Sequence, residues 1–488
     1  MRFRGPLAES YPAAVILVVC ALVPYLVLTS ALTPLEQLLQ KDLGLSSTAL
    51  QLTSGMANAA YSFGTVLAVQ LTMRLPVRRL LFLFAALFLV GSVLAAWAPT
   101  PGLFIAGRIV QGLTTGLMLI AAVPPLVLGW PVAKMRWTAI VMNLGIFGAV
   151  ALGPVVGGLF AGAKEWRWLF WATVIVAALT ILFVVLTFQD QEPQGRDAPV
   201  DIVGLCLAGF GCAAAFFGVS ELSSHALLSP IVIWPLLAGV ALIVGTLAYE
   251  YRTPDPLMPV ERLAHSIPVA GILTAMVAGA VSVAIVDLAD TALQGKGASP
   301  THAAMLFWPE FGGALATAAL FGALFFTRWV PLLAFSGLMI LAGGAAIITG
   351  AAGGSDALVA VGSGCAGIGA GASVSPALFM CGFSLDSPLL PRVFAMIELL
   401  RGVAAFLTGP ILLHIAMTTG GRPEVGLRNA AWVAFALAAG GALLVALIWV
   451  AGRARLQEPD VEGWLDGQGP AIESPPLGTA LRTDVHVA

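Results

Sequence analysis

Long apolar runs, separated by short polar stretches, repeat along almost the whole chain. A helix needs roughly 20 apolar residues to cross the hydrocarbon of a bilayer. Six runs of about this length precede the polar stretch 189–197 and eight follow it, so the pattern predicts fourteen transmembrane helices. We expect these spans near residues 12–32, 48–72, 80–98, 102–129, 138–162, 168–188, 202–222, 230–249, 266–289, 302–327, 330–350, 357–382, 393–416 and 430–452.

Positive charges test the span count independently, because cytoplasmic loops are enriched in Lys and Arg. With the N-terminus inside, fifteen of the 23 Lys and Arg residues fall in cytoplasmic loops, and six fall outside. The remaining two, Arg108 and Arg401, lie within spans. The bias predicts an even number of spans with both termini in the cytoplasm. The first apolar run is longer than the roughly 7–15 residues of a signal-peptide core, so we interpret it as the first span.

The composition agrees with an all-α integral membrane protein. The chain is 59% hydrophobic and only 10% charged, whereas soluble domains carry roughly 25% charged residues. A net charge of −2 argues against nucleic-acid binding. The five cysteines show no metal-binding spacing, and no phosphate loop or catalytic motif is present, so we expect no metal, no cofactor and no enzymatic activity. The tail 453–488 has no long apolar run and is expected to be disordered and cytoplasmic.

Ionisable side chains inside a membrane are costly, so each one within a span is a functional candidate. Arg108 either handles protons or an anionic substrate group, or is a structural arginine bonded to helix carbonyls. Glu310 has no partner nearby in the sequence, and hydrocarbon favours its neutral form; it is either a proton site or a neutral packed acid. Asp287 is either a proton carrier or a solvated acid near the end of its span.

Two further patterns lie in the spans. Glu398 and Arg401 are three residues apart, so they share a helix face and can form an ion pair; a structural pair is the favoured interpretation. The run Gly153-Pro154-Val155-Val156-Gly157-Gly158 places small residues beside a proline in the fifth span. This run indicates either close helix packing or a seam between moving halves of the protein.

Several of these motifs resemble those of the major facilitator superfamily. Arg108-x-x-Gln111-Gly112 resembles its fourth-helix motif, and Gly153-Pro154-x-x-Gly157-Gly158 resembles its antiporter motif. The following Trp166-Arg167-Trp168-Leu169-Phe170 resembles a signature of its fourteen-helix drug:proton antiporters. Asp201 and the run Pro256-Leu257-Met258-Pro259 also fit that subfamily.

The resemblance implies a domain organisation and a transport mechanism. Two pseudo-symmetric six-helix bundles, 1–188 and 266–452, would alternate access to a central cavity, with a linker and an inserted hairpin at 189–265. The implied cavity candidates, which differ in charge but all lie in spans, are Tyr25, Tyr61, Arg108, Gln111, Trp308 and Arg401. The implied conformational motif comprises Gly112, Gly153, Pro154, Gly157 and Gly158, together with Arg74 and Arg78 of the loop after the second span.

The chain departs from the family pattern at two positions. Met73 and Tyr25 stand where the family carries an Asp, and the first-helix Asp is the one linked to proton coupling. If coupling is retained, another group must serve it, and the candidates are Glu310, Asp287 and Glu398, with Arg108.

These features predict a divergent member of the family that exports an amphipathic or hydrophobic organic compound, drug-like or a natural product. Proton antiport across a bacterial cytoplasmic membrane is the expected mode. The cargo could instead be a lipid or lipid-like molecule. A transporter-shaped protein that no longer transports, and acts as a sensor or assembly partner, is the alternative from another class.

The charge distribution yields a topology prediction. Reporter domains fused after Arg196 and after Arg455 should both read as cytoplasmic, and one inserted near Ser299 should read as external, because these sites follow even, even and odd numbers of spans. Paired alkaline phosphatase and fluorescent protein fusions measure this directly. An external reading after Arg455 would show that the span count is odd.

Overall fold

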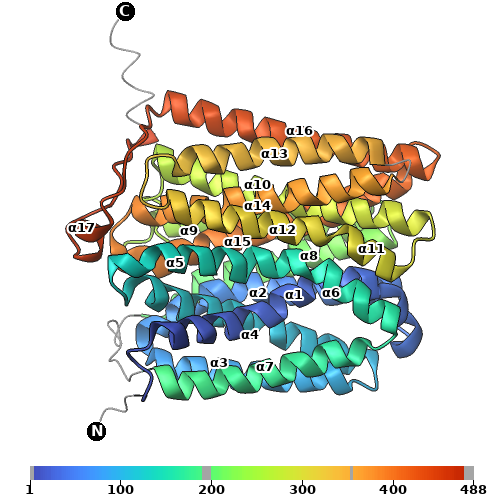
Figure 1. Cartoon of the computed structure of the whole chain (residues 1–488), viewed down its shortest axis with the longest axis horizontal. Coiled ribbons are helices and arrows are strands. Elements are labelled where there is room, and N and C mark those ends of the chain that lie inside the picture. Colours follow the sequence, from blue (N-terminus) through green and yellow to red (C-terminus); the bar gives the residue numbers. More distant parts are fainter. Residues whose placement is uncertain (1–4, 189–198, 352–354, 478–488) are drawn as a thin grey trace, which may run out of the picture. The chain divides into compact units, whose positions relative to one another are not determined.

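Long helices account for nearly all of the computed structural model, which describes residues 5–188, 199–351 and 355–477 (Figure 1). No β-strand occurs among these residues. In chain order the helices are α1 (Tyr11–Leu43), α2 (Ser47–Arg74), α3 (Val77–Trp97), α4 (Pro101–Leu128), α5 (Val132–Asn143), the π-helical η1 (Leu144–Gly148), α6 (Ala149–Ala163), α7 (Trp166–Thr187), α8 (Ile202–Ser220), the 3-10 turn η2 (Glu221–Ser223), α9 (Pro230–Arg252), α10 (Ser266–Gly295), α11 (Pro300–Leu306), α12 (Trp308–Leu324), α13 (Val330–Ala351), α14 (Asp356–Phe383), the 3-10 turn η3 (Ser387–Leu389), α15 (Leu390–Thr418), α16 (Pro423–Ala451) and α17 (Val461–Leu465).

The expected fold class is confirmed. Thirteen helical stretches in the described residues are long and apolar enough to cross a membrane, with α5 to α6 and α11 to α12 each forming one stretch. The remaining long helix, α2, has 28 residues but is less apolar, because it buries polar side chains such as Asn58, Thr65 and Gln70 against neighbouring helices. With α2, the long segments match the fourteen predicted spans. The polar stretch 189–197 lies outside the described residues.

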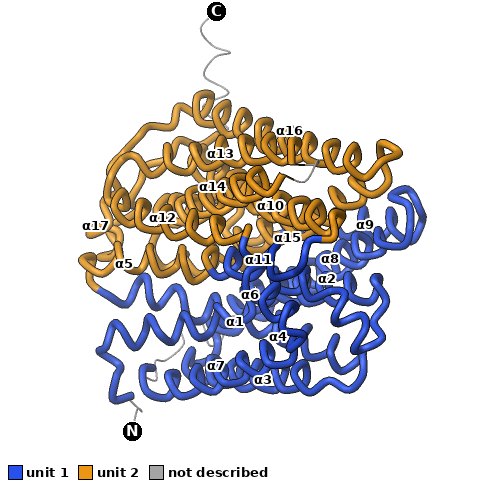
Figure 2. Tube along the Cα trace, turned by 45° about the vertical axis from the view of Figure 1, so that its right-hand side comes forward, with its two compact units in different colours: residues 1–130, 149–249, 298–305 blue, residues 131–148, 250–297, 306–488 orange. Residues whose placement is uncertain are grey.

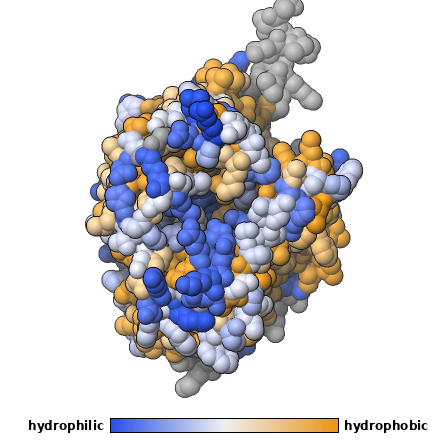
Figure 3. All heavy atoms as spheres, turned by 90° about the vertical axis from the view of Figure 1, so that its right-hand side faces the viewer, coloured by the Kyte–Doolittle hydropathy of each residue, from blue (hydrophilic) through white to orange (hydrophobic). Residues whose placement is uncertain are grey.

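Outward-facing side chains on the helices are largely hydrophobic. Trp234 and Val244 of α9 and Leu447 of α16 are 68%, 58% and 56% exposed. In the end-on view of Figure 3, hydrophilic residues gather at the helix ends and hydrophobic residues appear along the flanks. Such side chains suit contact with lipid, since exposed apolar surface on this scale is disfavoured in water.

The chain divides into two compact units, shown in blue and orange in Figure 2. Unit 1 comprises 1–130, 149–249 and 298–305, and unit 2 comprises 131–148, 250–297 and 306–488. In unit 1, α4 packs against α1, α2 and α3, and α8 packs against α2. In unit 2, α14 packs against α10, α12 and α13, and α5 packs against α12. The two six-helix bundles expected at 1–188 and 266–452 remain a prediction, because the division into units does not test them.

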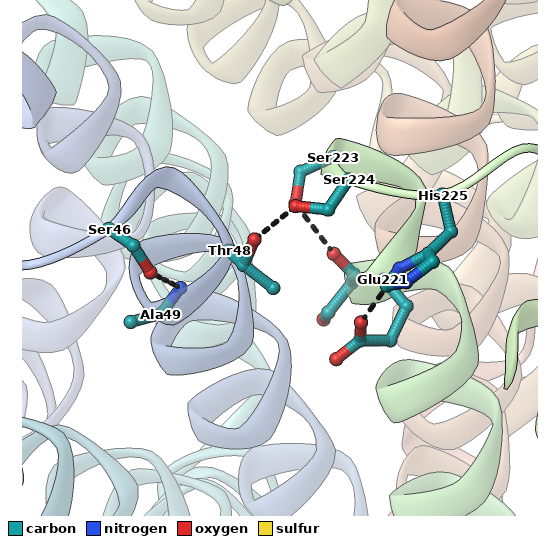
Figure 4. A network of polar contacts seen from close by, with 8 residues as sticks. Ser46, Thr48, Ala49, Glu221, Ser223, Ser224 and His225 are labelled. Atoms are coloured by element: carbon teal, nitrogen blue, oxygen red, sulfur yellow. Dashed lines mark hydrogen bonds and ion pairs between the residues drawn. The ribbon is translucent and has the colours of Figure 1, made fainter.

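The α8 helix is fastened to α2 at both of its ends within unit 1. At one end, Asp201 caps α8 by accepting from the Gly204 N–H at 2.9 Å, and its own N–H donates to Gln70 Oε1 of α2 at 3.1 Å. At the other end, Thr48 of α2 bonds Ser224 just beyond η2, as Figure 4 shows. These polar contacts fix both ends of α8 to α2 within unit 1.

The structure departs from the expected disorder of the tail 453–488 at α17 and its neighbours. The indole of Trp464 in α17 is 1% exposed, and its Nε1 donates to the Leu385 carbonyl at 2.7 Å. Its ring lies 5.1 Å from that of Phe383, at the end of α14. The tail has no long apolar run, but single apolar residues such as Trp464 reach an aromatic surface that the sequence pattern did not reveal. Residues 478–488 lie outside the described part of the chain.

Replacing Trp464 tests this packing. Because a fully buried Trp contributes about 3–5 kcal/mol relative to Ala, Trp464→Ala should release the tail and raise amide hydrogen exchange in residues 460–472 at least about tenfold. Hydrogen exchange of the detergent-solubilised protein, followed by mass spectrometry, provides the measurement. Trp432→Ala, at a position 49% exposed on α16, is the matched control. Unchanged protection in Trp464→Ala would mean that other contacts hold the tail.

Candidate functional site

A buried polar cluster in unit 1 is built around Arg108 of α4. Arg108 and Gln111 are one turn apart, and Arg108 Nη1 donates to Gln111 Oε1 at 2.9 Å. Gln111 Nε2 donates in turn to Ser92 Oγ of α3, also at 2.9 Å. All three side chains are at most 1% exposed. The motif spacing therefore turns two long polar side chains toward each other inside the helix packing.

Two stacked tyrosines complete this cluster. The Arg108 guanidinium carbon lies 5.0 Å from the ring centre of Tyr25 on α1. The Tyr25 ring stacks on Tyr61 of α2 with 5.8 Å between centres, and its hydroxyl donates to Asn58 Oδ1 at 2.9 Å. The structure thus brings together four of the predicted cavity residues. Cation–π attraction partly offsets the burial of the guanidinium.

Arg108 makes no ion pair with any described residue, and its buried Nε has no hydrogen-bond partner. Gly112 contributes to this geometry by allowing close approach. A Cβ at that position would lie 2.0 Å from the Ala57 carbonyl oxygen and 2.9 Å from the Tyr25 hydroxyl. Only glycine leaves room for both, since a side-chain carbon cannot come so near to backbone oxygen. The motif glycine therefore positions Tyr25 beside the guanidinium.

In α6, the glycines of the motif point in two directions within unit 1. A Cβ on Gly157 would lie 2.3 Å from the Ala31 carbonyl oxygen of α1. A Cβ on Gly158 would lie 2.7 Å from the Pro300 carbonyl oxygen of α11. Consecutive helical residues point about 100° apart, so adjacent glycines allow α6 to approach two different helices closely.

Pro154 leaves a carbonyl that another helix satisfies. Because proline has no N–H, the Val150 carbonyl loses its usual donor four residues on. Ser30 Oγ of α1 donates to that carbonyl at 2.6 Å. Gly153 permits the approach, since its Cβ would lie 2.1 Å from Ser30 Oγ. Gly153 and Pro154 thus form one packing device with Ser30.

Glu310 and Asp287 lie near each other in unit 2. The sequence predicted one continuous helix for the tenth span, but this span is interrupted at Phe307 between α11 and α12. Glu310 therefore lies in the first turn of α12. Its side chain is 6% exposed, and Oε2 is buried without a hydrogen-bond partner among the described residues. Asp287 of α10 is half-buried and close enough to interact electrostatically with Glu310. The two acids form the candidate proton site.

The ion pair expected from the spacing of Glu398 and Arg401 is present in α15. Arg401 Nη2 donates to Glu398 Oε2 at 2.5 Å and Nε donates to Oε1 at 3.3 Å. The Arg401 guanidinium also lies 5.5 Å from the ring centre of Phe147. Two bonds and an aromatic face satisfy the charge, which favours a structural role for the pair.

The remaining candidates are Trp308, Arg74 and Arg78. Trp308 is 44% exposed at the start of α12 and contacts Phe311 edge-on at 6.2 Å. Arg74 ends α2, and Arg78 lies in the first turn of α3; both are half-buried.

Uncharged polar residues were missed by the sequence analysis. Asn58 and Ser92 complete the Arg108 cluster. In unit 2, the buried Asn143 just before η1 donates to the Gly371 carbonyl of α14 at 2.8 Å. A search for Asn and Ser within the apolar runs would have found all three, whereas the search for ionisable groups passed over them.

This arrangement defines a multi-pass, all-helical membrane protein. The chain belongs to the Major Facilitator Superfamily, whose family model matches residues 17–405.

Comparisons with individual proteins agree with this assignment. The chain is 28% identical over 312 residues to a multidrug resistance protein B homolog of Mycobacterium tuberculosis, covering 62% of this chain and 57% of that protein. It is 28% identical over 233 residues to a lincomycin resistance protein of Streptomyces lincolnensis, covering 48% of each. The chain thus spans about half the length of the curated relatives it matches. The crystal structure of the human organic anion transporter MFSD10 (TETRAN) has the same fold, with a TM-score of 0.64, 13% identity, and coverage of 89% of this chain and 99% of that one.

The contact of Ser30 with Val150 predicts that the effect of replacing Ser30 on the free energy of unfolding depends on Pro154. Ser30→Ala leaves the Val150 carbonyl unpaired and should lower the free energy of unfolding by about 1–3 kcal/mol. In a Pro154→Ala background the backbone N–H returns, so the same substitution should cost little. Unfolding of the four variants of this cycle in mixed micelles measures the difference.

Thr29→Ala is the control, because the Thr29 hydroxyl bonds the Leu26 carbonyl within its own helix. Equal costs of Ser30→Ala in both backgrounds would show that the hydroxyl does not replace the missing donor.

Proposed function

We propose that the chain exports an amphipathic or hydrophobic organic compound by alternating access, coupled to proton movement through Glu310. Membership of the family supports transport of a small molecule across the membrane. The observation that carries the coupling is the buried Glu310 carboxyl, whose Oε2 lacks a hydrogen-bond partner among the described residues.

The relatives support the class of cargo. Two proteins with 28% identity are described by resistance, one to multiple drugs and one to lincomycin. Resistance to such compounds is what an exporter of drug-like molecules produces. The aromatic and aliphatic side chains around the buried clusters suit cargo of this kind.

The chemistry of Glu310 suits a group that loads and releases a proton. In a dry site an isolated carboxyl is held as the neutral acid, because no donor compensates a negative charge. Water entering the site during alternation would stabilise the carboxylate and release the proton. Asp287 adds a second acid within electrostatic range, and two negative charges there would repel each other. Glu398 is less suited to this role, since Arg401 bonds it directly.

Substitution of Glu310 tests the coupling. In inside-out proteoliposomes, an acidic lumen should stimulate wild-type uptake of a transported compound from a panel that includes lincomycin and ethidium. Glu310→Gln keeps the shape of the side chain but cannot ionise. It should lose at least about tenfold of the gradient-driven flux and retain gradient-independent exchange. The measurement is flux with and without a pH gradient.

The control is Asp386→Asn, which removes an exposed acid and should respond to the gradient as wild type does. A wild type that ignores the gradient would refute proton coupling and leave a facilitator or a non-transporting relative. An unimpaired Glu310→Gln response would make Glu310 a packed neutral acid and Asp287 the next residue to test.

A further inference from the structure

The guanidinium of Arg108 is buried without a counter-ion among the described residues. Arginine stays charged in proteins and carries five N–H donors. In the described structure these donors make one side-chain hydrogen bond, from Nη1 to Gln111, while the buried Nε makes none. An unpaired buried charge is costly, and one aromatic face compensates only part of that cost.

Other buried or half-buried arginines show how this chain normally satisfies the group. Arg401 is bonded twice by the Glu398 carboxylate. Arg167 of α7 donates to the Ala96 and Ala98 carbonyls at 3.0 and 3.1 Å. Among the described residues, Arg108 is bonded neither by a carboxylate nor by a set of carbonyls. Unit 1 therefore provides no described counter-ion for this guanidinium.

The side chains around Arg108 indicate the chemical nature of the ligand that would carry the anionic group. Tyr25 and Tyr61 present stacked rings, and Asn58, Ser92 and Gln111 add neutral polar groups. Aromatic faces favour an apolar or aromatic body. The planar fork of arginine matches a carboxylate, which can accept two parallel hydrogen bonds.

We propose that Arg108 anchors the carboxylate of an amphipathic organic acid, whose apolar body packs against Tyr25 and Tyr61. The proposal rests on the transport function above only in treating this acid as cargo. Because Arg108 is 1% exposed, the acid binds when the helices around the cluster separate, and it supplies the missing counter-charge as they close.

Paired ligands of equal size test the anchor. The probes are 1-pyrenebutyrate and its neutral amide, 1-pyrenebutanamide, titrated at pH 7.5 with the detergent-solubilised full chain and followed by fluorescence anisotropy. Wild type should bind the carboxylate at least about tenfold more tightly than the amide, since hydrogen bonds to a charged partner are among the stronger ones. Arg108→Gln should reduce this ratio to about one while still binding the amide, which also shows that the variant is folded.

A second variant removes the need for a ligand anion without removing the arginine. Tyr25→Asp places a carboxylate where the ring now faces the guanidinium, so the preference for the carboxylate probe should disappear or reverse. Arg167→Gln removes an arginine that bonds backbone carbonyls and should keep the wild-type ratio. Elution as a single peak in size-exclusion chromatography qualifies each variant for comparison.

Two outcomes would overturn the proposal. Equal wild-type binding of both probes would mean that Arg108 is neutralised by a group of the chain itself. A tenfold preference that persists in Arg108→Gln or in Tyr25→Asp would place the anion elsewhere. The ratio is measured without a gradient and without flux, so it can fail while export succeeds, and it can hold even if the chain does not export.

Discussion

Hydrocarbon offers no water to an unpaired backbone or side-chain polar group, and this constraint accounts for most of the architecture. Helices satisfy the backbone internally, and small residues then let helices approach until dispersion contacts hold them. The approach is close enough in places that a single methyl group would not fit, as at Gly112 against Ala57 or Gly157 against Ala31. Where proline removes a donor, a hydroxyl from the next helix replaces it, as Ser30 does for Val150.

Against this background, Arg108 and Glu310 are among the buried ionisable groups of the described structure that have an atom without a hydrogen-bond partner. Within the part of the chain that the structure describes, Arg108 in unit 1 has no counter-ion and Glu310 in unit 2 has an oxygen without a donor. The pair Glu398 and Arg401 shows that the same chain can bury charge with full compensation. An incomplete set of partners is useful to a protein that must bind and release, because a fully bonded group gains little from a ligand or a proton.

Features set by local periodicity were predictable from the sequence, and features set by three-dimensional neighbours were not. Run lengths predicted the spans, and a three-residue spacing predicted the bond between Glu398 and Arg401. The resemblance to a known family brought Tyr25 and Arg108 to attention, but only the structure shows the ring against the guanidinium. The burial of Trp464 depends on a surface distant in the chain. The break at Phe307 could have been predicted, because Pro309 stands in the first turn of the helix that follows it.

Stability alone does not explain why residues such as Arg108 and Glu310 occupy the interior. Leucine at either position would fill a similar space without the cost of burying a polar group, and replacing buried charges by apolar residues is often neutral or stabilising. The neighbours argue in the same direction. Gln111 bonds both Arg108 and Ser92, and Asn58 bonds Tyr25. These bonds fix the orientation of the guanidinium, while its Nε has no partner among the described residues. Such a network orients a charge without neutralising it, which is what the proposed binding of an organic acid requires.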